Sequence, residues 1–486
     1  MSKKGMVYLV GAGPGDQRLI TVKGLEALKQ AEVVLYDRLV NPILLQETSD
    51  HAELIYCGKL PDRHILRQEA INELLVEKAK LGKVVVRLKG GDPGVFGRVG
   101  EEAEALKKED ISYEIVPGIT SGIAAASYAG IPVTHREYGT SFTVVTGHDK
   151  SVDGKPLINW QALANGIDTI AFYMGIKNLP YICEQLTSNG RSPETKVAVI
   201  QWGTTGKQKV VEGSLRSIES EVAKQQISNP AITLVGNIVS LREQLQWFED
   251  KLLFGKKILF PESKASQRET LLNHGAEVLE YPKLVVQPEL GKQAYVEKLK
   301  TLRNYDEIFF CSKESVQLFF DSLISNGIDI RFLTAKLFGK NVEVIEALKN
   351  KGLFTEQTSV TSLSSRSLMV GSQEEINNDK NSCHYLITHD FKTSPSASVA
   401  FHRVIEEGGF NTVIFSSPRS VKNFIINAKL DGHDPYEIIR NCHVICSGED
   451  TLLEAKQSKI AVDIYSVDLN LENIEQLWMR EEKVIL

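Results

Sequence analysis

Residues 84–98 are Val-Val-Val-Arg-Leu-Lys-Gly-Gly-Asp-Pro-Gly-Val-Phe-Gly-Arg. The apolar start of this stretch, Val84–Leu88, predicts a buried strand. Four glycines and a proline then predict a sharply folded loop at the carboxyl end of that strand. Ligands bind at this edge of open α/β sheets, and Asp92 can accept hydrogen bonds there from a ribose or an amino group. Because glycine is conformationally costly, the pattern favours a binding loop over a merely structural one.

Short apolar strands alternate with helices on both sides of this stretch. The alternation predicts a doubly wound, mostly parallel α/β sheet. At Pro117-Gly118 the chain turns and a fresh series begins, so we expect two lobes, at about residues 1–117 and 118–240. The expected strands are 6–10, 33–36, 84–88, 113–116, 142–146, 169–173, 196–200 and 231–235. The expected helices are 19–30, 67–80, 100–109, 120–129 and 178–189.

A domain boundary is expected near residue 255. Residues 239–252 have the pattern of a helix, which predicts a first domain over 1–255 that ends in a helical linker, 239–255. Residues 256–486 form the second domain, again with an α/β pattern.

The second domain contains an internal echo. Ile308–Val316 and Val413–Val421 each predict a buried strand, a serine-containing turn and the start of a helix. We therefore expect two similar α/β lobes. The Ser/Thr/Asn-rich stretch 355–382 is expected to be a loose loop, and 355–390 looks short and polar for strands and helices.

Composition excludes several classes of protein. The net charge of −6 argues against a globally basic nucleic-acid binder, and 42% hydrophobic residues exclude extensive disorder. Six scattered cysteines without C-x-x-C pairs predict free thiols in a reducing compartment, with no zinc ribbon. The chain lacks a long apolar run, so we expect no membrane segment and a cytoplasmic protein. Of the 36 glycines, 26 lie in residues 1–255, which indicates two unlike halves.

A second glycine-rich loop, Gly11–Asp16, follows the first strand. Asp16 stands where a dinucleotide fingerprint has its third glycine, and Asp37 ends the second strand where a Rossmann fold places its ribose-binding acid. These features favour an NAD-dependent oxidoreductase. Pro14 argues against it, because proline removes an amide donor that a pyrophosphate needs. A plain tight turn is the structural alternative.

Eight segments together carry a family resemblance. They are Gly11–Asp16, Tyr36–Val40, Cys57–Lys59, Arg87–Arg98, Val116–Ser121, Ile131–Arg136, Thr146–His148 and Phe172–Gly175. Over residues 6–250 the chain closely resembles the uroporphyrinogen-III C-methyltransferases, which are tetrapyrrole methylases. The resemblance implies two α/β lobes with S-adenosyl-L-methionine between them, usually in a homodimer. It also implies methylation of uroporphyrinogen III at C-2 and C-7, which yields precorrin-2 and S-adenosyl-L-homocysteine.

The resemblance also assigns individual residues. Asp37 matches the family's proposed proton acceptor and Lys59 its proton donor, since a proton must leave the macrocycle after a pyrrole carbon attacks the methyl group. The sulfonium already activates that methyl group, so no metal is expected. The implied cofactor contacts are Pro14, Gly90, Gly91, Asp92, Val95, Thr120, Ser121, Met174 and Gly203. The substrate carries several carboxylates, and charge placement makes these residues candidates to bind them: Arg38, Arg98, Arg136 and His148.

Residues 256–486 resemble the uroporphyrinogen-III synthases. This second resemblance implies two lobes with a cleft that cyclises hydroxymethylbilane to uroporphyrinogen III, the substrate of the first domain. The cleft candidates are Ser312, Lys313, Ser417 and Arg419, with helix capping as the alternative. The family's Tyr-x-Thr segment corresponds here to Phe391-Lys392-Thr393, which lacks the tyrosine hydroxyl.

Two functional hypotheses therefore remain for this chain. One is a bifunctional enzyme of a siroheme or cobalamin route. The other is a methyltransferase fused to a non-catalytic tetrapyrrole-binding module. A methylase of another corrinoid or of RNA is opposed by the acidic charge and by the synthase-like neighbour.

Overall fold

The computed structural model describes residues 5–58, 67–148, 154–290, 293–355, 365–377 and 383–467. These residues contain four five-stranded sheets. Residues 1–282 together with 395–486 make one compact unit, and residues 283–394 make another. Three of the sheets belong to the first unit and one to the second.

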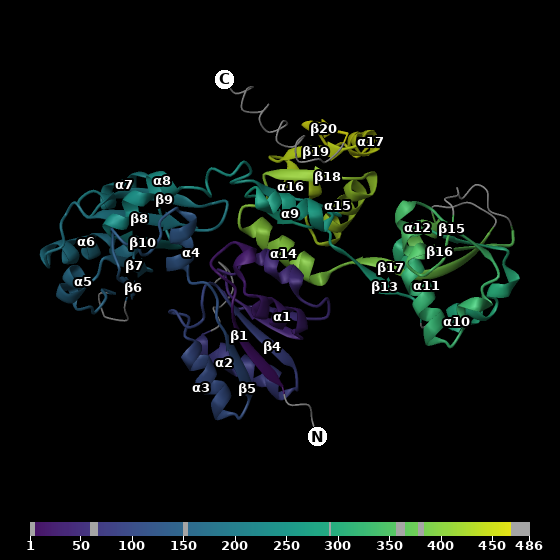
Figure 1. The fold of residues 1–486 in the computed structure, drawn as a ribbon, viewed down its shortest axis with the longest axis horizontal. Coiled ribbons are helices and arrows are strands. Elements are labelled where there is room, and N and C mark those ends of the chain that lie inside the picture. Colours follow the sequence, from purple (N-terminus) through teal and green to yellow (C-terminus); the bar gives the residue numbers. More distant parts are fainter. Residues whose placement is uncertain are drawn as a thin grey trace. The chain divides into compact units, whose positions relative to one another are not determined.

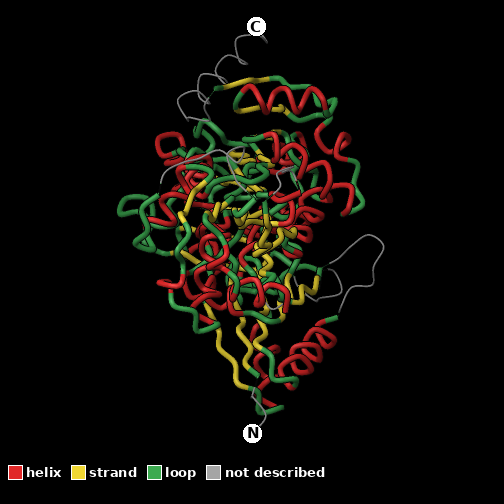
Figure 2. The backbone as a smooth tube through the Cα atoms, turned by 90° about the vertical axis from the view of Figure 1, so that its right-hand side faces the viewer, coloured by secondary structure: helices red, strands yellow, loops and turns green. Residues whose placement is uncertain are grey.

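The first sheet is parallel throughout, with the strand order β3-β2-β4-β1-β5. Near the N-terminus its strands run beside helices (Figures 1 and 2). The parallel arrangement predicted for this part of the chain is confirmed. The strands are β1 (Met6–Gly11), β2 (Val33–Tyr36), β3 (Glu53–Tyr56), β4 (Val84–Lys89) and β5 (Ser112–Val116). The helices are η1 (Gln17–Leu19), α1 (Val22–Gln30), η2 (Pro42–Glu47), α2 (Gln68–Lys80) and α3 (Val99–Lys108), where η denotes a 3-10 helix.

Helices cover both faces of this sheet. Val7 and Leu9 of β1 pack in a core with α2 and α3, whereas Val10 packs in a core with α1. Successive side chains of a strand point to opposite faces, which accounts for this alternation. Burial on both faces is what a parallel sheet requires, and it leaves the strand ends as the accessible edge.

The second sheet is mixed, so the mostly parallel pattern does not extend to it. Its order is β6-β7-β10-β8-β9, and β10 is antiparallel to both of its neighbours. The short connection between β8 and β9 explains their antiparallel pairing, because parallel neighbours need a longer crossover. The strands are β6 (Phe142–Thr146), β7 (Thr169–Tyr173), β8 (Lys196–Gln201), β9 (Lys209–Ser214) and β10 (Ala231–Val235). The helices are α4 (Ser121–Tyr128), α5 (Trp160–Gly166), η3 (Ile176–Asn178), α6 (Leu179–Ser188) and α7 (Ile218–Lys224).

The helix predicted over 239–252 is wrong in extent. The structure has the 3-10 helix η4 (Asn237–Leu241) and one α-helical turn, α8 (Arg242–Leu245), and then irregular backbone. Trp247 and Phe248 both pack edge-on against Tyr128, with ring centroids 5.0 and 4.7 Å away. Consecutive residues of a helix point about 100° apart, so continuing the helix would separate the two rings.

The third sheet, β12-β11-β18-β19-β20, is parallel and belongs to the first unit. Its strands are β11 (Lys257–Leu259), β12 (Glu277–Leu279), β18 (Thr412–Phe415), β19 (His443–Ser447) and β20 (Ile464–Ser466). Its helices are α9 (Ala265–Asn273), α14 (Pro395–Glu406), α15 (Pro418–Leu430), α16 (Pro435–Ile439) and α17 (Glu449–Gln457).

The fourth sheet, β13-β17-β16-β14-β15, forms the second unit. Its strands are β13 (Leu284–Pro288), β14 (Glu307–Phe310), β15 (Lys336–Gly339), β16 (Ser367–Ser372) and β17 (His384–Thr393). Its helices are α10 (Gln293–Lys300), η5 (Leu302–Asn304), α11 (Lys313–Ser325), η6 (Ile330–Phe332), α12 (Val342–Lys349) and α13 (Gln373–Asn377).

The predicted echo is present in these two sheets as β14 followed by α11 and β18 followed by α15. The loose loop predicted over 355–382 is wrong in part, because residues 367–372 form the central strand β16. Leu368 and Val370 of that strand are fully buried in the core of the unit. The serines at both ends of this strand interrupt the apolar pattern, so the sequence did not predict it.

Candidate active site

Three glycine-rich loops meet backbone to backbone at the carboxyl edge of the first sheet. The Gly91 amide donates to the Gly13 carbonyl over 2.7 Å, and the Gly13 amide donates back over 3.2 Å. A Cβ atom on Gly118 would lie 2.3 Å from the Gly91 carbonyl oxygen, and one on Gly11 would lie 2.6 Å from the Gly118 Cα. Gly11 and Gly118 are therefore required for loop packing, whether or not a ligand is bound.

Asp92 ties two of these loops together. Its Oδ1 accepts from the Gly94 amide over 2.7 Å, and its Oδ2 accepts from the Gly118 amide over 2.9 Å. Charge-assisted bonds of this kind are stronger than bonds between neutral groups. The carboxylate therefore holds the loop after β4 against the loop after β5.

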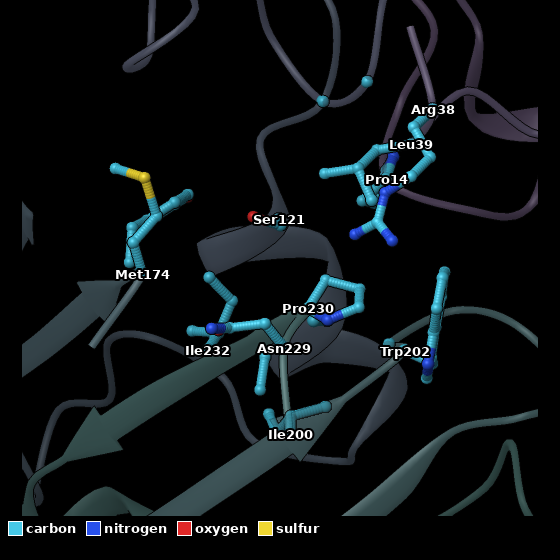
Figure 3. Close-up of a pocket in the computed structure, with 16 residues that line it drawn as sticks. Pro14, Arg38, Leu39, Ser121, Met174, Ile200, Trp202, Asn229, Pro230 and Ile232 are labelled. Atoms are coloured by element: carbon cyan, nitrogen blue, oxygen red, sulfur yellow. The ribbon is translucent and has the colours of Figure 1, made fainter. Parts of the chain in front are cut away.

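A cavity of about 920 Å³, including space open to solvent, lies beside these loops (Figure 3). Loops of the first sheet form one side of it and residues of the second sheet form the other, including Ile200 and Ile232. Arg38 points into the cavity in Figure 3. The full lining is Pro14, Arg38, Leu39, Gly90, Gly91, Ser121, Ala125, Tyr173, Met174, Ile200, Trp202, Gly203, Asn229, Pro230, Ala231 and Ile232.

Two residues that line the cavity have a left-handed backbone conformation. Met174 and Trp202 both line it, and their φ angles are +55° and +49°. Phe96 and Arg98, in the loop after β4, have φ angles of +57° and +59°. Non-glycine residues adopt this left-handed region at a cost of about 1–3 kcal/mol, and such residues cluster at functional sites.

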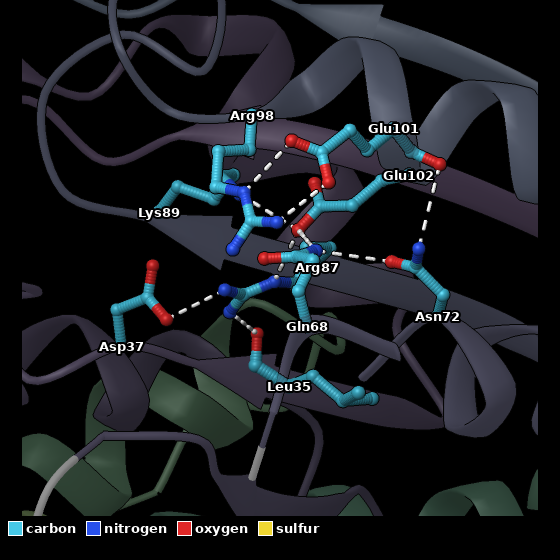
Figure 4. Close-up of polar contacts among 9 residues, drawn as sticks. All are labelled: Leu35, Asp37, Gln68, Asn72, Arg87, Lys89, Arg98, Glu101 and Glu102. Atoms are coloured by element: carbon cyan, nitrogen blue, oxygen red, sulfur yellow. Dashed lines mark hydrogen bonds and ion pairs between the residues drawn. The ribbon is translucent and has the colours of Figure 1, made fainter. Parts of the chain in front are cut away.

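A buried charge network lies behind Asp37 (Figure 4). Arg87 is 2% exposed and donates through Nη2 to Asp37 Oδ1 over 2.6 Å. Its Nε donates to Glu102 over 3.1 Å, and the Lys89 ammonium donates to the same carboxylate oxygen over 2.7 Å. The Asp37 side chain remains 31% exposed. One carboxylate oxygen of Asp37 is thus fixed from behind while the group stays open to solvent.

The network perturbs its basic members in opposite directions. Burial acts to lower the pKa of Arg87, but the carboxylates of Asp37 and Glu102 outweigh it and raise the pKa. Burial, assisted by the Arg87 charge, lowers the pKa of Lys89 below its ordinary value. Arg87 is therefore a permanent cation that holds Asp37 in one orientation.

Comparison with known proteins assigns the chain to a family. The family model of Tetrapyrrole (Corrin/Porphyrin) Methylases matches residues 6–219. The uroporphyrinogen-III C-methyltransferase of Bacillus subtilis (strain 168) is 44% identical over 454 residues, which cover 92% of this chain and 93% of that protein. The chain belongs to the tetrapyrrole methylase family.

Two further proteins are similar to this tetrapyrrole methylase. The porphyrin biosynthesis protein HemD of Ruminiclostridium josui is 36% identical over 479 residues, which cover 93% of this chain and 94% of that protein. The solved structure of uroporphyrin-III C-methyl transferase from Thermus thermophilus, complexed with S-adenyl homocysteine, is 36% identical with a TM-score of 0.42. That alignment covers 48% of this chain and 93% of the solved chain.

Six of the cofactor residues implied by the sequence surround the cavity of the methylase: Pro14, Gly90, Gly91, Ser121, Met174 and Gly203. The other three do not line it. Asp92 joins the loops as described, and Val95 packs against the core of the second lobe. Thr120 donates to or accepts from the Tyr173 hydroxyl over 2.6 Å, and its side chain does not cap α4. Cofactor contact remains a prediction for all nine residues.

The predicted acid–base and carboxylate-binding residues are less uniform. Asp37 does not line the cavity, although Arg38 does, and Lys59 lies outside the described residues. Arg98, the residue before α3, is bound to Glu101 of that helix, with its Nη2 2.6 Å from Oε2. Arg136 and His148 are exposed and do not line the cavity. Of these four cations, Arg38 alone is placed at the cavity.

The synthase-cleft candidates are at helix starts. Ser312 and Ser417 cap α11 and α15, where their side-chain oxygens accept from the amides of Ser315 and Ser420. Lys313 is exposed and lies 3.9 Å from Glu314. Arg419 Nε lies 3.4 Å from Glu262 Oε1. Helix capping, the alternative weighed from sequence, therefore describes both serines.

From the second lobe, sequence reasoning identified Ser121, Met174 and Gly203 as cavity residues but missed the others. Leu39, Ala125, Tyr173, Trp202 and the segment 229–232 carry no glycine or charge signal of their own. The pairs Trp202-Gly203 and Asn229-Pro230, at the end of β8 and the start of β10, are the signal that could have found the wall that the second sheet provides.

The described residues contain no group of three or more His, Cys, Asp or Glu side chains that could hold a metal ion. Among the same residues, no helix is both long and apolar enough to cross a membrane.

Proposed function

We propose that this chain is an S-adenosyl-L-methionine-dependent methyltransferase that methylates uroporphyrinogen III at C-2 and C-7 to give precorrin-2. The observation that carries the proposal is the cavity between the two lobes, which six residues of the family's cofactor motifs surround. The relative with 44% identity over 92% of the chain, whose name states this activity, supports the substrate assignment.

The cavity suits a small organic cofactor. A Cβ atom on Gly91 would meet nothing closer than the Ser121 amide nitrogen at 3.9 Å, so this glycine leaves space at the cavity wall. The wall combines the backbone of Gly90 and Gly91 with the apolar side chains of Ile200 and Ile232. Ligand sites commonly pair apolar walls with a few polar groups in this way.

S-adenosyl-L-methionine, when bound, supplies an electrophilic methyl group. The chain's own residues orient the acceptor and exclude water, which is the larger part of such catalysis. Arg38 offers its guanidinium to a substrate carboxylate at the cavity. Asp37, held by Arg87, accepts the proton that the methylated macrocycle must lose.

The test uses the full chain with uroporphyrinogen III and S-adenosyl-L-methionine in the absence of oxygen. We expect precorrin-2, with two methyl groups transferred per macrocycle. We also expect S-adenosyl-L-homocysteine, and not NAD, to raise Tm, since a ligand that binds the native state stabilises it. A Tm increase with NAD alone, or no methylation of uroporphyrinogen III, would refute the proposal.

A second candidate activity, cyclisation of hydroxymethylbilane, is favoured by the repeated strand–serine–helix units of residues 256–486. A protein named HemD also aligns over 93% of the chain. Against it, the polar groups at the start of α15 already have a partner, because the Glu262 carboxylate contacts Ser417, Arg419 and Asn423. The full chain is given hydroxymethylbilane. The type III isomer would support a synthase, and the type I isomer alone would support a non-catalytic module.

A homodimer is proposed as well. The edge strand β5 exposes Tyr113 and Ile115, and α4 exposes Ile123. Light scattering behind a sizing column tests this assembly. A mass of one chain at micromolar concentration would contradict it.

A further inference from the structure

A side pocket opens next to the main cavity. Its volume is about 510 Å³, including space open to solvent. Pro14, Arg38, Leu39 and Trp202 line both spaces, so the two adjoin. Its lining also includes Lys207, Lys257, Glu277, Val404 and Glu407.

Part of this side pocket comes from sequence beyond the methyltransferase segment. Lys257 begins β11, Glu277 begins β12, Val404 lies on α14, and Glu407 directly follows α14. All four belong to the same compact unit as the glycine loops. The third sheet and its helices thus contribute directly to a pocket beside the methylase cavity.

Packing and polar contacts fix this contribution in place. Helix α14 packs on η2, and Phe401 and Val404 share one apolar core with Leu44. The Arg403 guanidinium lies 4.4 Å from the centroid of the Tyr56 ring. Arg403 is buried and Tyr56 is partly buried, and partial removal from water strengthens such a cation–π contact. The packing of α14 on η2 therefore holds the third sheet, and with it Lys257 of β11, beside the side pocket.

The two carboxylates of the side pocket already have partners. Glu277 Oε1 accepts from the Gly206 amide over 2.8 Å. Glu407 Oε1 accepts from Arg403 Nη2 over 2.9 Å. Both carboxylates attract the Lys257 ammonium through space, yet among the described residues neither forms a hydrogen bond or an ion pair with it.

The cations of the side pocket have fewer polar partners than its carboxylates. The side chains of Arg38 and Lys257 form no hydrogen bond or ion pair with any residue that the structure describes. The Lys207 ammonium donates to the Glu407 backbone carbonyl over 2.6 Å and lies 5.8 Å from the centroid of the Trp202 ring. Burial, with a contribution from the Lys207 charge, lowers the pKa of Lys257 despite the opposing attraction of Glu277 and Glu407, so a further anion in the pocket would favour the charged form.

We propose that the side pocket is a carboxylate subsite of the methyltransferase, in which Lys257 of the C-terminal region binds an acidic side chain of the tetrapyrrole together with Arg38 and Lys207. The inference rests on the proposed function. A macrocycle that approaches the cofactor bound in the main cavity carries acidic chains around its rim, and Arg38 and Trp202 line both spaces. Lys257 binds substrate and takes no part in the chemical step.

The test compares full-length wild type with Lys257→Gln, Lys257→Arg and the distant surface variant Lys429→Gln. We expect Lys257→Gln to raise the KM for uroporphyrinogen III roughly tenfold or more, the loss of one charge-assisted contact. The KM for S-adenosyl-L-methionine should stay within twofold of wild type, about the scatter of such comparisons. Lys257→Arg should recover most of the loss, and Lys429→Gln should match wild type.

A binding measurement separates this inference from the proposed function. Uroporphyrin III, the oxidised octacarboxylate, is titrated into each variant and followed by fluorescence quenching, with no chemistry required. Weaker binding by Lys257→Gln alone supports the subsite even if wild type methylates nothing. Equal binding by all variants overturns it. A KM increase for S-adenosyl-L-methionine instead of the tetrapyrrole assigns the pocket to the cofactor carboxylate and also overturns it.

Discussion

Arg87 Nη2 lies 2.6 Å from Asp37 Oδ1, and Arg87 reaches that position from the middle of a buried strand. Asp37 directly follows the neighbouring strand β2, so the contact ties the end of β2 to β4 next to the cavity loops. Arg87 also donates to Glu102, so one buried side chain contacts both carboxylates. Replacing Arg87 would therefore disturb Glu102 as well as the proposed proton acceptor.

Replacement of Asp37 by Asn should slow methyl transfer without weakening cofactor binding. The amide cannot accept a proton, and loss of a general base costs about 10²–10⁴-fold in rate. Single-turnover methylation measures the rate, and calorimetry with S-adenosyl-L-homocysteine measures Kd. A rate within threefold of wild type would exclude Asp37 as the proton acceptor.

Replacement of Arg87 by Gln should reduce both kcat and stability. Asp37 loses its orienting contact, and buried Glu102 retains one cation, Lys89. Breaking a buried ion pair costs about 3–5 kcal/mol, so urea unfolding should show a loss of that order. The double variant Arg87→Gln/Glu102→Gln is the control and should recover part of the stability but not the rate. Recovery of the rate as well would mean that Arg87 does not position Asp37.

Two glycine-to-alanine variants should separate loop packing from ligand space. In Gly118→Ala the new methyl group collides with the Gly91 carbonyl, so we expect a lower Tm together with weaker binding of S-adenosyl-L-homocysteine. In Gly91→Ala the backbone has a φ of +71°, which costs about 1–2 kcal/mol, and the methyl group enters open space. Ligand affinity should therefore fall more than stability does. The same ratio of the two effects in both variants would contradict this division.

The serine at the start of α15 should behave as a helix cap. Ser417 Oγ accepts from the Ser420 amide over 3.0 Å, and removal of such a cap costs about 1 kcal/mol. Ser417→Ala should lose that amount in chemical unfolding, and Ser417→Asn, which also caps, should recover it. Loss of cyclisation in Ser417→Asn with full stability would reveal a catalytic role that capping does not explain.

Stability should fall at alkaline pH for an identifiable reason. Burial raises the pKa of Cys57 from 9.0 to about 11 and that of Tyr36 from 10.0 to about 12. The folded state keeps both groups protonated where the unfolded state has lost the proton, so it binds more protons. The stabilisation is complete below the unfolded values and is lost as pH rises through the folded ones, by about 1.4 kcal/mol per pH unit per group. Unfolding free energies of Cys57→Ala should fall less steeply between about pH 9 and 11 than those of wild type. Equal slopes would contradict the assignment.

Much of the fold was predictable because apolar runs bounded by glycine or proline mark strands clearly. The bounds of β2, β6, β7 and β10 match the sequence expectation. The central strand β16 was missed because serines stand at both of its ends, and its burial comes from neighbours that are distant in sequence. Hydrophobic pattern alone does not report such neighbours.

The candidate site divides in the same way. The glycine loops were identified because glycine leaves a strong local signal, whereas Trp202 and Ile232 look like ordinary residues beside a strand. Their role depends on two sheets facing one cavity, a tertiary property. The sequence also does not show that these glycines have different roles. Gly118 permits close packing of the loops, whereas Gly91 leaves space at the cavity wall.

The docking of α14 on η2 has a consequence for how the chain can be divided. Leu44 and Leu45 of η2 are buried in one core with Ala400 and Phe401 of α14. A fragment ending near residue 255 would expose the apolar surface of η2 to water, and we expect such a fragment to aggregate. In calorimetry we therefore expect the chain up to β12 and the chain from α14 onward to unfold in one transition. This unfolding unit combines the methyltransferase segment with part of the synthase-like region.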